Sequence, residues 1–192
     1  MVCPHDNLVL TVSGLTQIFA HRKLKYALIG GLALSQQIFP RYTKDIDFLI
    51  DVPVSQMSNL LEDIQAIGGV LDASEACDAW QNEHMLSFHL NGIRVDWLKP
   101  FIPAYAHVIE HAYADILLDQ SIRIAAIEGL ILLKLLAFSD MDKLDVASMV
   151  AAKRETLNLA WIDTEWQAIG ELSDPPMVWF KQRYHHITTG GS

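Results

Sequence analysis

The sequence predicts an α/β protein: a mixed sheet flanked by helices, with a helical bundle at the C-terminal end. Three observations support this fold class. Short apolar runs with strand character alternate with helical segments in the first two thirds of the chain, Asn91-Gly92 marks a β-hairpin, and the chain from about Ile127 onward has helical character. We expect a core over residues 1–125 and a helical region over residues 126–192 that packs on the core.

The composition sets the broad class. The chain has 192 residues, of which 51% are hydrophobic, so it can bury a sizeable core. Its 23 acidic residues outnumber 14 basic ones, giving a formal net charge of −9. This balance argues against a broad nucleic-acid footprint and suits a cationic small-molecule acceptor.

The sequence also predicts a cytoplasmic protein. Cys3 and Cys77 lack metal-binding spacing and fit reduced thiols. The start of the chain lacks the pattern of a signal peptide. The most apolar run, residues 124–138, is too short to span a bilayer and carries Glu128 and Lys134, so we expect no membrane segment.

The elements of the first third follow from periodicity and breakers. We expect helices at 15–22, 32–39 and 55–67, and strands at 26–29 and 45–51. Pro40 ends the second helix and Pro53 follows the second strand. The third helix has apolar residues on one stripe, and Gly68-Gly69 ends it.

A hairpin is the clearest local signal. Residues 84–90 and 93–98 flank Asn91-Gly92, the dipeptide preferred in two-residue type I′ turns. Such a turn pairs Leu90 with Ile93, Phe88 with Val95 and Leu86 with Trp97. The opposite face then carries Ser87, His89, Arg94 and Asp96. Both strands place their apolar residues on the same face, which supports this register.

The rest of the chain is predicted to be mainly helical. We expect a helix at 104–114 and a short strand at 121–125. Helices follow, with breaks near 139–140 and 157–160. The polar, glycine-ended segment 185–192 is expected to be frayed.

Two aspartates on the second strand suggest a metal site. Asp45 and Asp47 are two residues apart and share one strand face. Adjacent carboxylates repel each other unless a cation lies between them, and Mg²⁺ takes one or two carboxylates together with phosphate oxygens and water. The alternative is a pair of solvated aspartates on an edge strand.

Neighbouring residues support phosphate chemistry. Gly30-Gly31 lies between a strand and a helix start, where a phosphate can approach the backbone N–H groups. Arg41 and Lys44 precede the acidic pair and could hold further phosphate charge, or belong to a solvated loop. Asp96 lies on the polar face of a hairpin strand whose other face is apolar. Its carboxylate is either exposed to solvent or, if the strand lies well inside the fold, needs a partner.

These segments together resemble the nucleotidyltransferase superfamily, and most closely its AbiEii-like toxin and minimal-nucleotidyltransferase branches. The resemblance covers roughly residues 24–150. It rests on five segments in order: ALIGGLAL (27–34), RYTKDIDFL (41–49), IRVDWL (93–98), IEGLILLKLLA (127–137) and DKLDV (142–146).

The resemblance implies metal-dependent transfer of an NMP from an NTP to a hydroxyl acceptor. Asp45, Asp47 and Asp96 would hold Mg²⁺ or Mn²⁺, with Asp96 also acting as or assisting the base. The implied nucleotide-binding residues are Gly30, Gly31, Arg41, Thr43, Lys44, Lys134 and Lys143. The acceptor stays open between tRNA, protein and a small molecule, and a toxin-like enzyme could have an antitoxin-like protein partner.

Two departures keep a second class open. Gly31 stands where many members have serine, and Met141 precedes Asp142 where an arginine is common. A catalytically idle binding or partner-interaction module with the same fold is therefore the alternative. A further pattern, His107-x-x-Glu110-His111, matches the H-x-x-E-H zinc peptidases, or is simply the polar face of an amphipathic helix.

Overall fold

The computed structural model describes residues 4–38, 40 and 43–190. The strands are β1 (Lys25–Ile29), β2 (Asp45–Asp51), β3 (Met85–Leu90), β4 (Ile93–Leu98), β5 (Tyr113–Leu117) and β6 (Gln120–Ile124). The helices are α1 (Pro4–His21), α2 (Gly30–Gln37), α3 (Val54–Ala66), α4 (Ala73–Asn82), α5 (Pro103–Glu110), α6 (Ile127–Ala137), α7 (Asp140–Lys153), α8 (Leu159–Gln167) and α9 (Pro175–Thr188).

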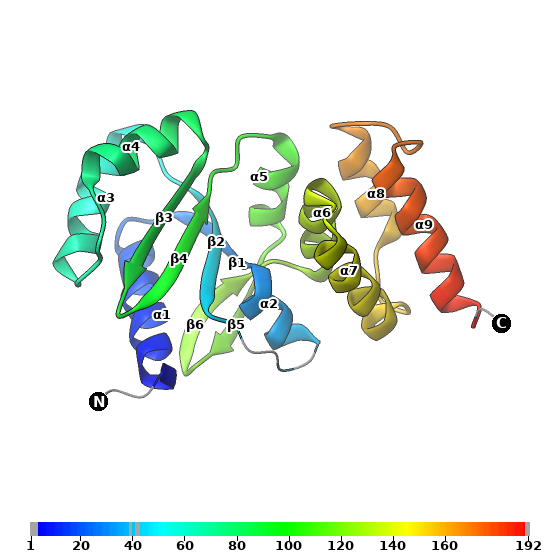
Figure 1. Ribbon diagram of the computed structural model, residues 1–192, viewed down its shortest axis with the longest axis horizontal. Coiled ribbons are helices and arrows are strands. Elements are labelled where there is room, and N and C mark those ends of the chain that lie inside the picture. Colours follow the sequence, from blue (N-terminus) through cyan, green and yellow to red (C-terminus); the bar gives the residue numbers. More distant parts are fainter. Residues whose placement is uncertain (1–3, 39, 41–42, 191–192) are drawn as a thin grey trace.

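The strands form one mixed sheet, which confirms the predicted fold class. Its six strands lie in the order β3-β4-β2-β1-β6-β5. The central strand β2 pairs antiparallel with β1 and parallel with β4. Helices α6 to α9 gather at the end of the molecule opposite α3 and α4 (Figure 1), and α6 contacts both α2 and α5 of the sheet region.

The two faces of β2 differ in chemistry. Ile46, Phe48 and Ile50 are fully buried. The Phe48 ring meets the Phe19 ring of α1 edge-on, with centroids 5.2 Å apart. Because side chains alternate along a strand, Asp45 and Asp47 point to the opposite face.

The predicted hairpin register is confirmed. Leu90 pairs with Ile93, Phe88 with Val95, Leu86 with Trp97 and Ser87 with Asp96. Asn91 and Gly92 both have positive φ, at 53° and 75°, as a type I′ turn requires. Turn and patterning therefore agree, and Asp96 lies on the polar face.

Several predicted boundaries are wrong. Helix α1 begins at Pro4 rather than near residue 15. Gly14 lies within α1, where a Cβ would lie 3.0 Å from Ile67 Cδ1. Its missing side chain allows close packing of α1 on the end of α3.

The predicted helix at 104–114 is too long, and two elements were not predicted. Helix α5 ends at Glu110, and residues from Tyr113 onward form β5. This edge strand exposes Ile116 by 60%, so its apolar residues do not mark a buried face. Helix α4 was also missed, and α9 continues to Thr188 through much of the segment expected to fray.

The C-terminal region is helical as predicted, with a further break between α8 and α9 at residues 168–174. Within the residues that the structure describes, no helix is long and apolar enough to cross a membrane.

Candidate nucleotide and metal site

The fold brings two of the predicted aspartates side by side. Strand β2 runs parallel to β4, and the register places Asp47 directly opposite Asp96. Asp45 lies opposite Arg94. The residues Asp47 and Asp96 are far apart in sequence, so their proximity depends on this strand pairing.

The Gly30-Gly31 turn packs against the Asp47 carboxylate. Gly30 has a φ of +66°, and a Cβ at this position would overlap the carboxylate of Asp47. The backbone N–H of Gly31 donates a hydrogen bond to the same carboxylate, which lowers the Asp47 pKa. Glycine at position 30 is therefore needed both for the left-handed conformation and for space beside Asp47.

Asp47 is electrostatically strained. Burial raises its pKa, as do the negative charges of Asp96 and Asp45, while Lys134 and the Gly31 N–H lower it. The net effect raises the pKa from 3.8 to about 6. Burial and the like charges of Asp96 and Asp45 thus disfavour ionisation of Asp47, and a cation between the carboxylates would relieve the repulsion.

Asp96 has protein partners as well. Ser87 Oγ donates to Asp96 Oδ1 at 2.5 Å, and Arg94 Nε donates to the same oxygen at 3.0 Å. The Asp96 side chain is 19% exposed. The polar face of the hairpin supplies both donors, so these contacts hold the Asp96 carboxylate in place.

A small cavity adjoins Asp47. Its volume is about 250 Å³. It is lined by Ile29, Gly30, Gly31, Leu34, Asp47, Leu130, Leu133, Lys134, Ala137 and Asp142. The cavity therefore joins the predicted phosphate turn and Asp47 to the α6–α7 helix pair.

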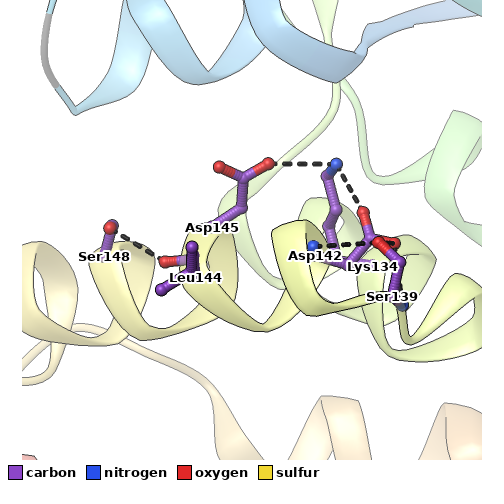
Figure 2. A network of polar contacts seen from close by, with 6 residues as sticks. All are labelled: Lys134, Ser139, Asp142, Leu144, Asp145 and Ser148. Atoms are coloured by element: carbon purple, nitrogen blue, oxygen red, sulfur yellow. Dashed lines mark hydrogen bonds and ion pairs between the residues drawn. The ribbon is translucent and has the colours of Figure 1, made fainter.

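Lys134 of α6 is held by two carboxylates of α7 (Figure 2). Its Nζ lies 2.7 Å from Asp142 Oδ1 and 3.0 Å from Asp145 Oδ2. Asp142 Oδ2 also accepts from the Ser139 hydroxyl at 2.6 Å, in a capping box that begins α7. The two acids are three residues apart and so share one helix face. Their pairing with Lys134 was not predicted from the sequence.

In this cluster the ammonium and the carboxylates stabilise each other's charged forms. Burial lowers the Lys134 pKa, but its hydrogen bonds to Asp142 and Asp145 outweigh burial and raise the pKa overall. Burial likewise raises the Asp142 pKa, but hydrogen bonds from Lys134 and Ser139 lower it overall. The ammonium and the Asp142 carboxylate are thus both charged at neutral pH.

The other predicted nucleotide-binding residues lie in different settings. Thr43 Oγ1 donates to the Asp45 carbonyl at 3.1 Å, and Lys44 is exposed. Lys143 turns toward Asp140 and the Phe138 ring, 4.5 Å from its centroid, and does not line the cavity. Arg41 lies outside the described residues.

The H-x-x-E-H pattern has a structural explanation. His107 Nδ1 lies 2.6 Å from Glu165 Oε2 of α8, and His111 follows the end of α5. Across residues 4–38, 40 and 43–190, no group of three or more His, Cys, Asp or Glu side chains is gathered closely enough to hold a metal ion. Within these ranges, neither His107 with Glu165 nor Asp45, Asp47 and Asp96 form such a group.

Comparison with known proteins places the sequence in a family. The sequence model of the nucleotidyl transferase AbiEii toxin family, a type IV toxin–antitoxin system, matches residues 15–147. A search of curated proteins found no match.

Two solved structures show the same fold. One is an antigenic nucleotidyltransferase-like protein from Paracoccidioides brasiliensis, with 21% identity and a TM-score of 0.50 over 76% of each chain. The other is ANT(2″)-Ia in complex with adenylyl-2″-tobramycin, with 12% identity and a TM-score of 0.51 over 96% of this chain and 99% of that chain. Since the AbiEii match spans more than half of the sequence, the chain belongs to the nucleotidyl transferase AbiEii toxin family.

Proposed function

We propose that this nucleotidyltransferase moves a nucleoside monophosphate from an NTP to a hydroxyl acceptor, using Mg²⁺ or Mn²⁺ held at Asp45, Asp47 and Asp96. The observation that carries the proposal is the pairing of Asp47 with Asp96 beside the Gly30-Gly31 turn. Family membership supports the reaction class. The metal and the acceptor are part of the proposal.

The donor chemistry fits a hard divalent cation. The site offers carboxylate oxygens, and the Asp47 pKa is raised first by burial and then by the negative charges of Asp96 and Asp45. Mg²⁺ is usually bound through one or two carboxylates, with substrate phosphates and waters completing its shell. A complete cage of protein ligands is therefore not required before the nucleotide binds.

The phosphates would bind on the α2 side of the site. The N-terminus of α2 begins at Gly30, and its backbone dipoles favour an anion. Lys134, at the cavity beside this turn, would add a positive charge. Thr43 and Lys44 precede β2, while Lys143 would need to leave Phe138 to take part.

The reaction would be a displacement at the α-phosphorus. The acceptor oxygen bonds to phosphorus as the bond to the pyrophosphate oxygen breaks, and the acceptor proton passes to Asp96. Ser87 and Arg94 both bind Asp96 Oδ1, so Oδ2 is the oxygen that would face the acceptor. A bound divalent cation would stabilise the developing charge and lower the pKa of the acceptor hydroxyl.

Two classes of acceptor are compatible with these observations: a macromolecule, either tRNA or protein, and a cationic small molecule. Family membership favours a toxin-like enzyme, acting on tRNA or protein, with an antitoxin partner. The net charge of −9 instead favours a cationic small molecule. The structural likeness to a protein in complex with adenylyl-2″-tobramycin adds modest support to the second alternative.

Incubation with labelled NTPs and a cell extract tests the proposal. Wild type should transfer label to one class of acceptor in the presence of Mg²⁺. Asp96→Asn should lose transfer by about 10²–10⁴-fold, as expected for a lost catalytic base, while largely keeping Mg-NTP binding. If wild type transfers nothing and Mg-NTP titration shows no metal-dependent binding, the proposal is wrong.

A binding module without turnover is the second candidate. The observation that favours it is the engagement of Asp96 by Arg94 and Ser87, which satisfies this carboxylate without a metal. Calorimetric titration of Mg-NTP into wild type and an Asp45→Ala/Asp47→Ala variant separates the two. Metal-dependent binding that produces no transfer with any extract would favour the module.

A further inference from the structure

The Lys134 ammonium lies at a cavity that Asp47 and Asp142 also line, and Asp145 is a further partner of this ammonium. Lys134 is the only cation among the cavity-lining residues that the structure describes. Its Nζ forms ion pairs with Asp142 and Asp145, at 2.7 Å and 3.0 Å. Lys134 and Asp47 line the same cavity, and the charge of Lys134 lowers the pKa of the Asp47 carboxyl.

The position of the Lys134 ammonium matters because a positive charge next to Asp47 would stabilise the ionised form of that carboxylate. Asp47 is partly buried beside Asp96 and Asp45, and an adjacent ammonium would compensate this charge. A lysine side chain is flexible, and its compact ammonium can pair with any acid in reach. An ion pair between Lys134 and Asp47 would, however, occupy the carboxylate that the proposed cation needs.

In the structure the ammonium pairs with the α7 carboxylates instead. Asp142 is fixed by the capping box with Ser139, which uses its Oδ2 and leaves Oδ1 for Lys134. Asp145 lies one helical turn further along and approaches the ammonium from the same helix. In Figure 2 both acids project from α7 toward Lys134 and enclose its Nζ.

We infer that Asp142 and Asp145 are positioning residues, which hold the Lys134 ammonium on the α7 side of the cavity and so keep Asp47 available to a divalent cation. This inference rests on the proposed function. Neither acid is a metal ligand in it. Both act through Lys134.

Mn²⁺ affinity, measured by the loss of the free-ion EPR signal, tests the inference without any acceptor. D142N/D145N should bind Mn²⁺ about tenfold more weakly than wild type, a typical effect of an outer-shell change. Asp140→Asn is the matched control, since Asp140 is on the same helix but its side chain is 99% exposed. It should bind Mn²⁺ as wild type does.

Removal of the lysine supplies the decisive comparison. Lys134→Gln in the D142N/D145N background should restore affinity to within about twofold of wild type, because no ammonium is left to occupy Asp47. The same change in wild type should have little effect, since the ammonium is already held away. Such non-additivity is expected only for residues that act through one another.

Several outcomes would overturn the inference. Equal gains from K134Q in both backgrounds would indicate simple charge additivity, and unchanged affinity in D142N/D145N would remove the effect altogether. Asparagine keeps an oxygen for Ser139, but if the double variant does not fold, D145N with and without K134Q answers the same question. If wild type binds no Mn²⁺, alone or with inorganic triphosphate, the proposed metal site fails and this inference with it.

Discussion

Two acidic clusters lie on either side of one cavity, and they differ in how their charge is compensated. On α7, Asp142 accepts hydrogen bonds from Lys134 and Ser139, and these bonds lower its pKa. On the sheet, Asp47 faces Asp96 across adjacent strands, and its pKa is raised to about 6. The α7 cluster contains its own cation, whereas Asp47 lies beside the like charges of Asp96 and Asp45.

The difference indicates which cluster contributes to structure and which to function. Paired, hydrogen-bonded charges stabilise a fold against their own removal, because deletion of one partner leaves the other buried and unpaired. Buried like charges destabilise a fold until a ligand compensates them. Sites of this second kind are typical of functional residues.

The largest expected effect is loss of the α7 cluster. Lys134→Met should reduce the free energy of unfolding by roughly 3 kcal/mol, the lower end of the range for breaking a buried ion pair, because the Lys134 side chain is 24% exposed. Denaturant unfolding at pH 7 measures the change. Lys143→Met is the control and should cost far less, because Lys143 pairs with an exposed Asp140. Equal losses in the two variants would contradict the contrast.

Neutralisation of the sheet cluster should have the opposite sign. Asp47→Asn should raise the free energy of unfolding at pH 8 in a chelating buffer. The rise of the Asp47 pKa from 3.8 to about 6 corresponds to about 3 kcal/mol. Asp51→Asn, an exposed position on the same strand, should change stability little. A destabilised Asp47→Asn variant would show that the carboxylate is compensated in the folded protein.

The gain from Asp47→Asn should depend on pH. Because the folded pKa is raised, protonated Asp47 favours the fold, and this contribution is present below pH 3.8 and lost as pH rises through about 6. The stability difference between Asp47→Asn and wild type should therefore be full at pH 8 and shrink toward zero near pH 4. Unfolding curves across this range measure it. A difference that is independent of pH would assign the gain to packing.

The smallest effect concerns the start of α7. Ser139→Ala should cost about 1 kcal/mol, typical of a lost N-cap. Ser148→Ala is a control on the same helix, since the Ser148 hydroxyl donates only to the Leu144 carbonyl at 2.9 Å (Figure 2), and alanine has the higher helix propensity. If both changes cost the same, the capping box does not anchor the α7 cluster.

The sequence predicts the local part of this picture well. Period-two alternation places Asp45 and Asp47 on one face, and the Asn91-Gly92 turn sets the hairpin register around Asp96. Both are short-range effects. The nucleotidyltransferase fold is confirmed by the family match and the sheet.

The parts that depend on tertiary packing were not predictable. Gly30 was interpreted as a phosphate turn, but its contact with Asp47 needs the pairing of β1 with β2. The engagement of Lys134 by α7 depends on how two helices meet. Helix α4 was missed because its sequence is mostly polar and its buried residues are Ala76 and Trp80. Strand β5 was missed because it is an edge strand in which Leu117 is the buried residue.

Thermal unfolding with and without Mn²⁺ tests the central claim most directly: Asp47, whose pKa is raised by burial and by the charges of Asp96 and Asp45, belongs to a cation site. At about a hundredfold excess over Kd, wild type should gain roughly 5–10 °C in Tm. Asp47→Asn should start higher in chelator and show no gain. Equal Mn²⁺ responses in the two proteins, or none in wild type, would contradict the account.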